Sequence, residues 1–151
     1  MDMQFDPAEK WDFDYKKILP LVDIFMPNEQ ELMALTGKGS VEDAVAEVRP
    51  YINVLVVKMG SKGSLVVTKD GEKVLPAMLN RNVVDAIGAG DSFNSGFITA
   101  FVQGKDLEYC QYFGNLTGAI NTTAAGGTGA FSSKKAIEEA ALKHFNQTIK
   151  L

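Results

Sequence analysis

The sequence Gly-Ala-Gly-Asp at residues 88–91 joins three small residues to a carboxylate where a helix is expected to begin. Backbone N–H groups at a helix N-terminus bind anions, because they point at the ligand and the helix dipole favours negative charge there. A carboxylate beside a bound phosphate can orient an attacking hydroxyl and accept its proton. These residues fit phosphoryl transfer, with Asp91 as the base and Gly88, Ala89 and Gly90 as the anion site. The alternative is that Asp91 only complements the helix dipole.

A second group of polar residues lies in the segment PNEQE, residues 27–31. Asn28 and Glu31 are three positions apart after a short apolar run, so their oxygens can point to one side. Mg²⁺ prefers oxygen ligands and often reaches them through water. Asparagine at an N-cap with glutamate three residues later also resembles a capping box, and the two roles can coexist.

The segment VVKMGSKGSLVV, residues 56–67, places Gly60 and Gly63 between two β-rich runs. A plain turn is one interpretation, and a loop in which Lys58 and the glycines line a nucleotide is the other. Two common phosphate motifs are excluded. The P-loop pattern occurs nowhere in the chain, and the dinucleotide fingerprint fails because Phe93 stands where its third glycine belongs.

The first half of the chain reads as strands alternating with helices. The expected elements are a strand near 22–26, a helix over 29–35 closed by Gly37, a helix following Ser40, a strand over 52–59 and a hairpin over 64–76. The run INVLVVKM lacks polar alternation, which indicates a strand covered on both faces and favours a parallel sheet. Asp70 and Gly71 suit the tight turn of the hairpin.

The second half reads as helices. Phe93, Phe97 and Phe101 recur every four residues on a helix that runs to Gly104. Asp106 is a plausible cap for the next helix, which carries one apolar face. A segment of small residues at 124–133 precedes a last helix that starts near Ser132 or Ser133. Strands alternating with helices, followed by helices alone, predict an α/β layered protein.

Composition limits the class of protein. With 151 residues, 46% hydrophobic and 23% charged, we expect one folded domain over residues 1–151. The net charge of -4, without clusters of Lys and Arg, argues against nucleic acid as a partner. The apolar runs are too short for a membrane span and no signal peptide is visible, so a cytoplasmic location is expected. The single Cys110 fits a helix core, and the lone His144 argues against zinc or histidine catalysis.

The three motifs, taken in order, resemble those of one family. DAIGAGDSFNSGF closely resembles the C-terminal signature of the ribokinase-like (PfkB) carbohydrate kinases. PNEQE is similar to the family's N-x-x-E motif, and VKMGSKG is similar to its nucleotide loop. The resemblance implies a three-layer α/β/α fold, of which this chain is the C-terminal portion. It also implies ATP-dependent phosphorylation of a sugar hydroxyl.

Site roles follow from the resemblance, residue by residue. It implies that Asp91 is the catalytic base, that residues 88–90 hold the transferring phosphoryl group, and that Asn28 and Glu31 position Mg²⁺ and phosphates. The residues that would border the ATP are Lys58, Gly60, Ser61, Gly63 and Asn115, the last of them near the adenine. Asp85 matches an acidic residue associated with a monovalent-cation site. The chain departs from the family at Ala86, where threonine is usual, and in the segment 124–133.

Family members are longer, and the N-terminal part that carries their sugar site and lid is not visible in this sequence. We therefore expect an ATP-side fragment that self-associates or pairs with a missing N-terminal part. As an isolated chain, it is expected to be inactive. One alternative is a nucleotide-binding module or regulatory remnant without catalysis. A simple α/β scaffold, in which Asn28 caps a helix and Asp91 serves the dipole, is the other.

Overall fold

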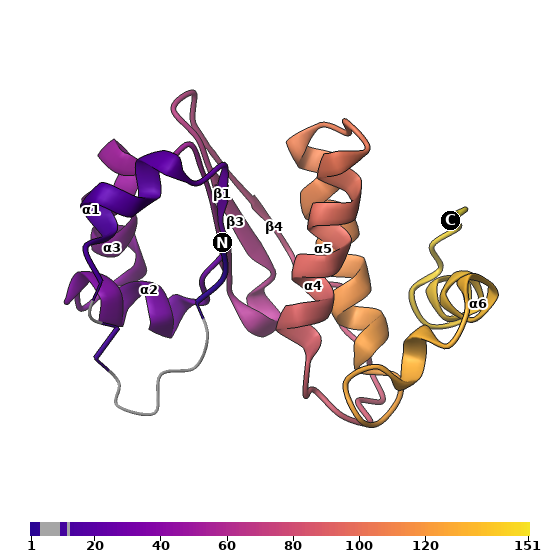
Figure 1. The fold of residues 1–151 in the computed structure, drawn as a ribbon. Coiled ribbons are helices and arrows are strands. Elements are labelled where there is room, and N and C mark those ends of the chain that lie inside the picture. Colours follow the sequence, from indigo (N-terminus) through magenta and orange to yellow (C-terminus); the bar gives the residue numbers. More distant parts are fainter. Residues whose placement is uncertain (4–9, 12) are drawn as a thin grey trace. The chain divides into compact units, whose positions relative to one another are not determined.

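The computed structural model describes residues 1–3, 10–11 and 13–151. The chain divides into two compact units (Figure 1). The first contains Met1–Gly60 and Ser64–Val74, and the second contains Ser61–Gly63 and Leu75–Leu151. The three motifs are therefore distributed over both units.

The first unit combines short helices with a small sheet. Its α-helices are α1 (Tyr15–Ile18), α2 (Glu29–Thr36) and α3 (Val41–Val48). Its strands are β1 (Ile24–Phe25), β2 (Val54–Lys58), β3 (Ser64–Val67) and β4 (Glu72–Leu75), whose last residue belongs to the second unit. Short 3-10 turns follow α1 and α3, at Leu19–Leu21 and Arg49–Tyr51, and another at Gly60–Lys62 separates β2 from β3. Two predicted helix boundaries are confirmed: Gly37, in the left-handed conformation, follows the end of α2, and Ser40 caps the start of α3.

The sheet has the order β1-β2-β3-β4 and is mixed. β1 and β2 are parallel, with Ile24 opposite Val54, whereas β2 and β3 are antiparallel, with Leu55 opposite Val67. The expectation of a parallel sheet is thus correct for the first pair and wrong for the second. The short turn after β2 sends the chain directly back beside it, and a direct return of this kind gives antiparallel pairing.

β2 is buried on both faces, as its unbroken apolar sequence predicts. Leu55 and Val57 belong to a core cluster, whereas Val56 points to the other face and is paired with Val66. The side chains that share the cluster with Leu55 and Val57 include Leu19, Phe25, Leu32, Val45, Val48 and Val67. α2 and α3 bury their apolar sides in this cluster, and it packs them against β1 and β2.

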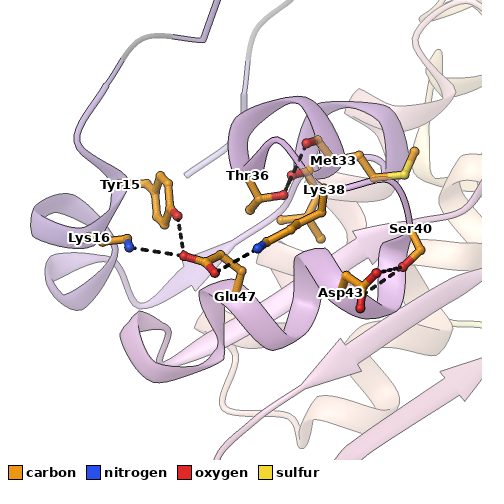
Figure 2. Close-up of polar contacts among 9 residues, drawn as sticks. Tyr15, Lys16, Met33, Thr36, Lys38, Ser40, Asp43 and Glu47 are labelled. Carbon is orange, nitrogen blue, oxygen red and sulfur yellow. Dashed lines mark hydrogen bonds and ion pairs between the residues drawn. The ribbon is translucent and has the colours of Figure 1, made fainter.

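A cluster of polar side chains around Glu47 links α1, the turn after α2, and α3 (Figure 2). The Glu47 carboxylate accepts a hydrogen bond from the Tyr15 hydroxyl at 3.0 Å. It also forms ion pairs with Lys16 at 3.2 Å and Lys38 at 3.4 Å. Lys16, followed by Tyr15 and Lys38, holds the pKa of Glu47 below its ordinary value, because all three contacts stabilise the charged form.

We expect Glu47→Gln to lower the melting temperature at neutral pH and to flatten its dependence on pH. A carboxylate whose pKa is depressed in the folded state stabilises the fold above its unfolded-state pKa, and that stabilisation is lost as the pH falls through the folded-state pKa. Melting curves between pH 7 and pH 3 measure this. Glu42→Gln, on the same helix, is the control. Equal pH profiles for the unaltered chain and Glu47→Gln would contradict the role assigned to Glu47.

The second unit is mostly helical. It contains α4 (Ala89–Val102), α5 (Leu107–Asn121), a 3-10 turn at Gly129–Phe131 and α6 (Lys134–Phe145). α4 and α5 lie side by side (Figure 1). They pack closely because glycines face side chains across the contact. A Cβ added to Gly96 would lie 2.1 Å from Thr117 Oγ1, and one added to Gly114 would lie 3.0 Å from the Phe93 ring.

The predicted faces of these helices are largely confirmed. Phe93 and Phe97 are buried with stacked rings 6.1 Å apart, but Phe101, on the last turn of α4, is 38% exposed. Cys110 is buried on α5, and burial raises the pKa of its thiol. His144 is exposed near the end of α6. Among the described residues, no helix combines the length and the apolar character that a membrane span requires.

Candidate active site

The N-terminus of α4 begins at a glycine, which offers no side chain to cap the helix. Gly88 is its N-cap, with φ of 75°, and no side chain caps this helix end. By contrast, α2, α3, α5 and α6 are each capped by a side chain, from Asn28, Ser40, Asp106 and Ser133 respectively. A side chain at position 88 would be strained by the left-handed backbone, and its Cβ would lie 3.1 Å from the Cα of Gly127. The turn therefore requires glycine for two separate reasons.

Asp85 joins this turn to the loop that follows α5. One carboxylate oxygen accepts from the Ile87 N–H at 2.9 Å, and the other accepts from the Gly126 N–H at 3.0 Å. The Gly126 and Ile87 N–H donors lower the pKa of Asp85, because they stabilise its charged form. The structure thus shows Asp85 as a link between two loops, and its predicted association with a monovalent cation stays a prediction.

A pocket of about 720 Å³ opens beside the start of α4, within the second unit. Its lining includes Gly88 and Asp91 at the helix N-terminus, Ser95 and Thr99 further along α4, Phe113 on α5 and Lys134 on α6. Asp91 is exposed toward this space. The carboxylate and the helix N-terminus therefore reach the same cavity.

The first turn of α4 shows which backbone groups are already engaged. The Ala89 N–H donates to the Ala86 carbonyl at 3.2 Å, and the Ser92 N–H donates to the Gly88 carbonyl at 2.9 Å. The N–H groups of Gly90 and Asp91 lie between them, in the part of a helix that has no intrahelical acceptors. N–H groups in this part of a helix are the ones that can donate to an anion.

Asn28 and Glu31 form the capping box that their spacing suggests. The Asn28 N–H donates to Glu31 Oε2 and the Glu31 N–H donates to Asn28 Oδ1, both at 2.8 Å. The cap is thus confirmed, and the magnesium role stays a prediction. The described residues contain no group of three His, Cys, Asp or Glu side chains that could hold a metal ion. Asn28 Oδ1 and Glu31 Oε2 are held in place by the cap, and oxygen atoms are the ligands that Mg²⁺ prefers, often through water.

The sheet brings Asn28 and Lys58 together in the first unit. The two residues form a parallel bridge just beyond β1 and at the end of β2, and the Lys58 N–H donates to the Pro27 carbonyl at 2.9 Å. The Lys58 ammonium forms an ion pair with Asp2 at 2.9 Å. Two of the three motifs, which are separate in the sequence, therefore meet at one end of a pair of parallel strands.

The remaining residues that are predicted to border the nucleotide lie in two places. Gly60, with φ of 57°, and Ser61 begin the exposed 3-10 turn between β2 and β3. Gly63 and Asn115 both lie against the end of β4 and the residues that follow it. A Cβ on Gly63 would lie 2.0 Å from the Leu75 carbonyl oxygen, and Asn115 Nδ2 donates to that oxygen at 3.4 Å. The structure thus brings Gly63 and Asn115 to one segment, and Asn115 is buried there.

Sequence reasoning missed Asn121, the last residue of α5. Its side chain is buried and contacts both sides of the turn at Gly88. No local signal marks it, because its partners lie about 30 residues earlier and are recognised only once α4 and α5 pack together. Asp85, in contrast, is singled out by the family resemblance, although for a cation and not for its contact with Gly126.

Comparison with known proteins identifies the family to which this chain belongs. The model of the pfkB family carbohydrate kinases matches residues 1–134, and the chain belongs to this family. Solved structures that resemble it share the ribokinase-like α/β fold, of which this chain represents a part, as predicted. The expected family is therefore confirmed.

Its relatives are sugar and nucleoside kinases. An uncharacterized sugar kinase from Archaeoglobus fulgidus is 37% identical over 78% of this chain and 48% of its own. A nucleoside kinase from Methanocaldococcus jannaschii is 37% identical over 82% of this chain and 42% of its own. The structure of Arabidopsis thaliana ribokinase with ribose and ATP has a TM-score of 0.74 at 30% identity, over 83% of this chain and 42% of that one. The chain spans less than half of the length of these relatives.

Proposed function

We propose that this chain carries the ATP site and the catalytic base of an ATP-dependent carbohydrate kinase, which phosphorylates a sugar hydroxyl. The observation that carries the proposal is the pocket in the second unit, where the exposed Asp91 carboxylate lies beside a helix N-terminus free of side-chain caps. Membership of the pfkB family, and a related ribokinase structure that holds ribose and ATP, support the choice of substrates.

Each group has a defined task in this proposal. The Asp91 carboxylate orients the acceptor hydroxyl and takes its proton, as the new O–P bond forms and the bond between the γ-phosphorus and the bridging oxygen of ADP breaks. The N–H groups of the first turn of α4, with the helix dipole, stabilise the negative charge on the transferring phosphoryl group. Asn28 and Glu31 would hold Mg²⁺ through water, and Mg²⁺ when bound neutralises charge on the phosphates. The residues proposed to border the nucleotide are Lys58, Gly60, Ser61, Gly63 and Asn115.

We also propose that the chain acts as the C-terminal, ATP-side part of a larger catalytic unit, formed with an N-terminal part or by self-association. The length of the relatives supports this, since each is more than twice as long as the matched region. Exposed apolar side chains in the second unit support it as well. Val83, Val84 and Ile87, just before α4, are 59–73% exposed, and apolar groups clustered in this way are typical of contact surfaces.

A calorimetric titration of the 151-residue chain with Mg·ATP is the direct test. Saturable binding is expected, because the residues proposed for the nucleotide lie within the chain. Sugar-dependent release of ADP then separates a catalytic chain from a nucleotide-binding module without catalysis. Binding without turnover in the isolated chain, together with turnover once an N-terminal part is added, supports a part that needs its partner. Absence of nucleotide binding, in the chain and in every active assembly that contains it, would contradict the proposal.

A further inference from the structure

We infer that Asn121 is a positioning residue that holds the anion-binding turn at the start of α4 in its working geometry. The inference deepens the proposed function and rests on it. Asn121 is the last residue of α5 and is 1% exposed. A buried amide side chain is costly unless its donor and acceptor are both satisfied. In this structure both are satisfied by the two flanks of the turn.

The two contacts of Asn121 enclose residues 88–91. Its Nδ2 donates to the Ile87 carbonyl at 2.7 Å, just before Gly88. Its Oδ1 accepts from the Ser92 hydroxyl at 3.0 Å, just after Asp91. A carboxamide offers a donor and an acceptor on one rigid plane, so a single side chain fixes both ends of the four-residue segment.

Neighbouring contacts hold the same segment from α5. The Thr117 hydroxyl donates to the Ser92 carbonyl at 2.8 Å. The Thr122 carbonyl accepts from the Val84 N–H at 2.9 Å, and the Thr122 hydroxyl accepts from Asn80 Nδ2 at 2.9 Å. The C-terminal end of α5 therefore anchors the chain that leads into the turn, and Asn121 is the member of this group that contacts both flanks.

This arrangement matters because anion stabilisation depends on donors that are already aimed at the charge. The Ile87–Gly88 peptide sets the direction of the first turn of α4, and Gly88 adopts the left-handed conformation. Glycine has little conformational preference of its own, so the turn needs an external constraint. Asn121 supplies that constraint without adding a negative charge beside the anion.

The test uses the ¹⁵N-labelled 151-residue chain and inorganic phosphate as the probe. We expect phosphate to shift the amide resonances of residues 88–92 in the unaltered chain. Asn121→Ala should weaken the affinity about tenfold, because the donors lose their preorganisation. Faster hydrogen exchange at Ala89 and Ser92, whose N–H groups are hydrogen bonded within the turn, should accompany this loss, with exchange at the Leu116 amide unchanged. Gln111→Ala, which removes another 1% exposed polar side chain from α5, is the matched control.

The control separates positioning from stability. Both variants should melt at lower temperatures than the unaltered chain, but only Asn121→Ala should lose phosphate affinity when both are measured fully folded. Should Asn121→Ala not fold, Ser92→Ala replaces it, since it removes the partner that orients the Asn121 amide. If the variant used binds phosphate as tightly as the unaltered chain, the inference is overturned but the proposed function is not. If the unaltered chain shows no phosphate shifts at residues 88–92, the inference fails, whereas the proposed function is decided separately by nucleotide binding in the chain and in its active assemblies.

Discussion

Replacing Asp91 with asparagine is expected to lower the rate of sugar phosphorylation by about a hundred- to ten-thousandfold, the usual contribution of a general base. Asparagine has nearly the same shape, so the pocket and the first turn of α4 should persist. It cannot accept the proton of the acceptor hydroxyl, because its amide is not basic. Nucleotide affinity should stay within a few-fold of the original value.

The measurement is ADP release in whichever assembly of the chain phosphorylates a sugar, alongside a calorimetric titration with Mg·ATP. Ser95→Ala changes another α4 residue that lines the same pocket, one turn further along, and should reduce the rate much less. A rate in Asp91→Asn close to that of the unaltered protein would show that the proton is taken by another group. A parallel loss of nucleotide binding would instead indicate that Asp91 supports the site structurally.

Replacing Gly63 with alanine is expected to destabilise the chain by about 3 kcal/mol or more, the second large effect. The added Cβ would lie 2.0 Å from the Leu75 carbonyl oxygen and 2.6 Å from the Ala77 nitrogen. Both are backbone atoms, so the clash cannot be relieved by turning a side chain. The φ of 105° adds strain for any residue other than glycine.

Denaturant unfolding monitored by circular dichroism measures this loss. Gly60→Ala, in the same 3-10 turn region, is a matched control, because its φ of 57° is also positive but nothing lies within 4 Å of an added Cβ. We expect Gly60→Ala to cost about 1 kcal/mol, the left-handed penalty alone. Similar losses in the two variants would mean that the segment after β4 moves away from position 63.

Much of the fold is predictable because its signals are local. Caps lie next to the helices they stabilise, so Asn28, Ser40 and Asp106 were each visible in the sequence. The hairpin turn through Asp70 and Gly71 is equally local. The apolar run of β2 correctly predicts burial on both faces, yet burial does not determine the direction of the neighbouring strand. For this reason the prediction of a parallel sheet is only partly correct.

The residue types of the candidate site are predictable from the sequence, but the hydrogen bonds between its distant segments are less so. The spacing of Gly88 and Asp91 indicates a carboxylate beside an anion-binding turn, and the structure places both at one pocket. The contacts of Asp85 with Gly126, and of Asn121 with Ile87, join positions 41 and 34 residues apart. Such contacts depend on how α4 packs on α5, and no local pattern encodes them.

The glycine-lined contact between α4 and α5 has a consequence for motion. Gly96 and Gly114 admit Thr117 and the Phe93 ring at close range, and a Cβ on Gly118 would lie 3.2 Å from the Ala89 carbonyl oxygen. Helices interlocked in this way resist sliding, because each shift would create overlap or a void. The pair should therefore move as one rigid body. The turn at residues 88–91 and the Asn121 side chain that contacts both its flanks would then move together, and their relative geometry would be preserved.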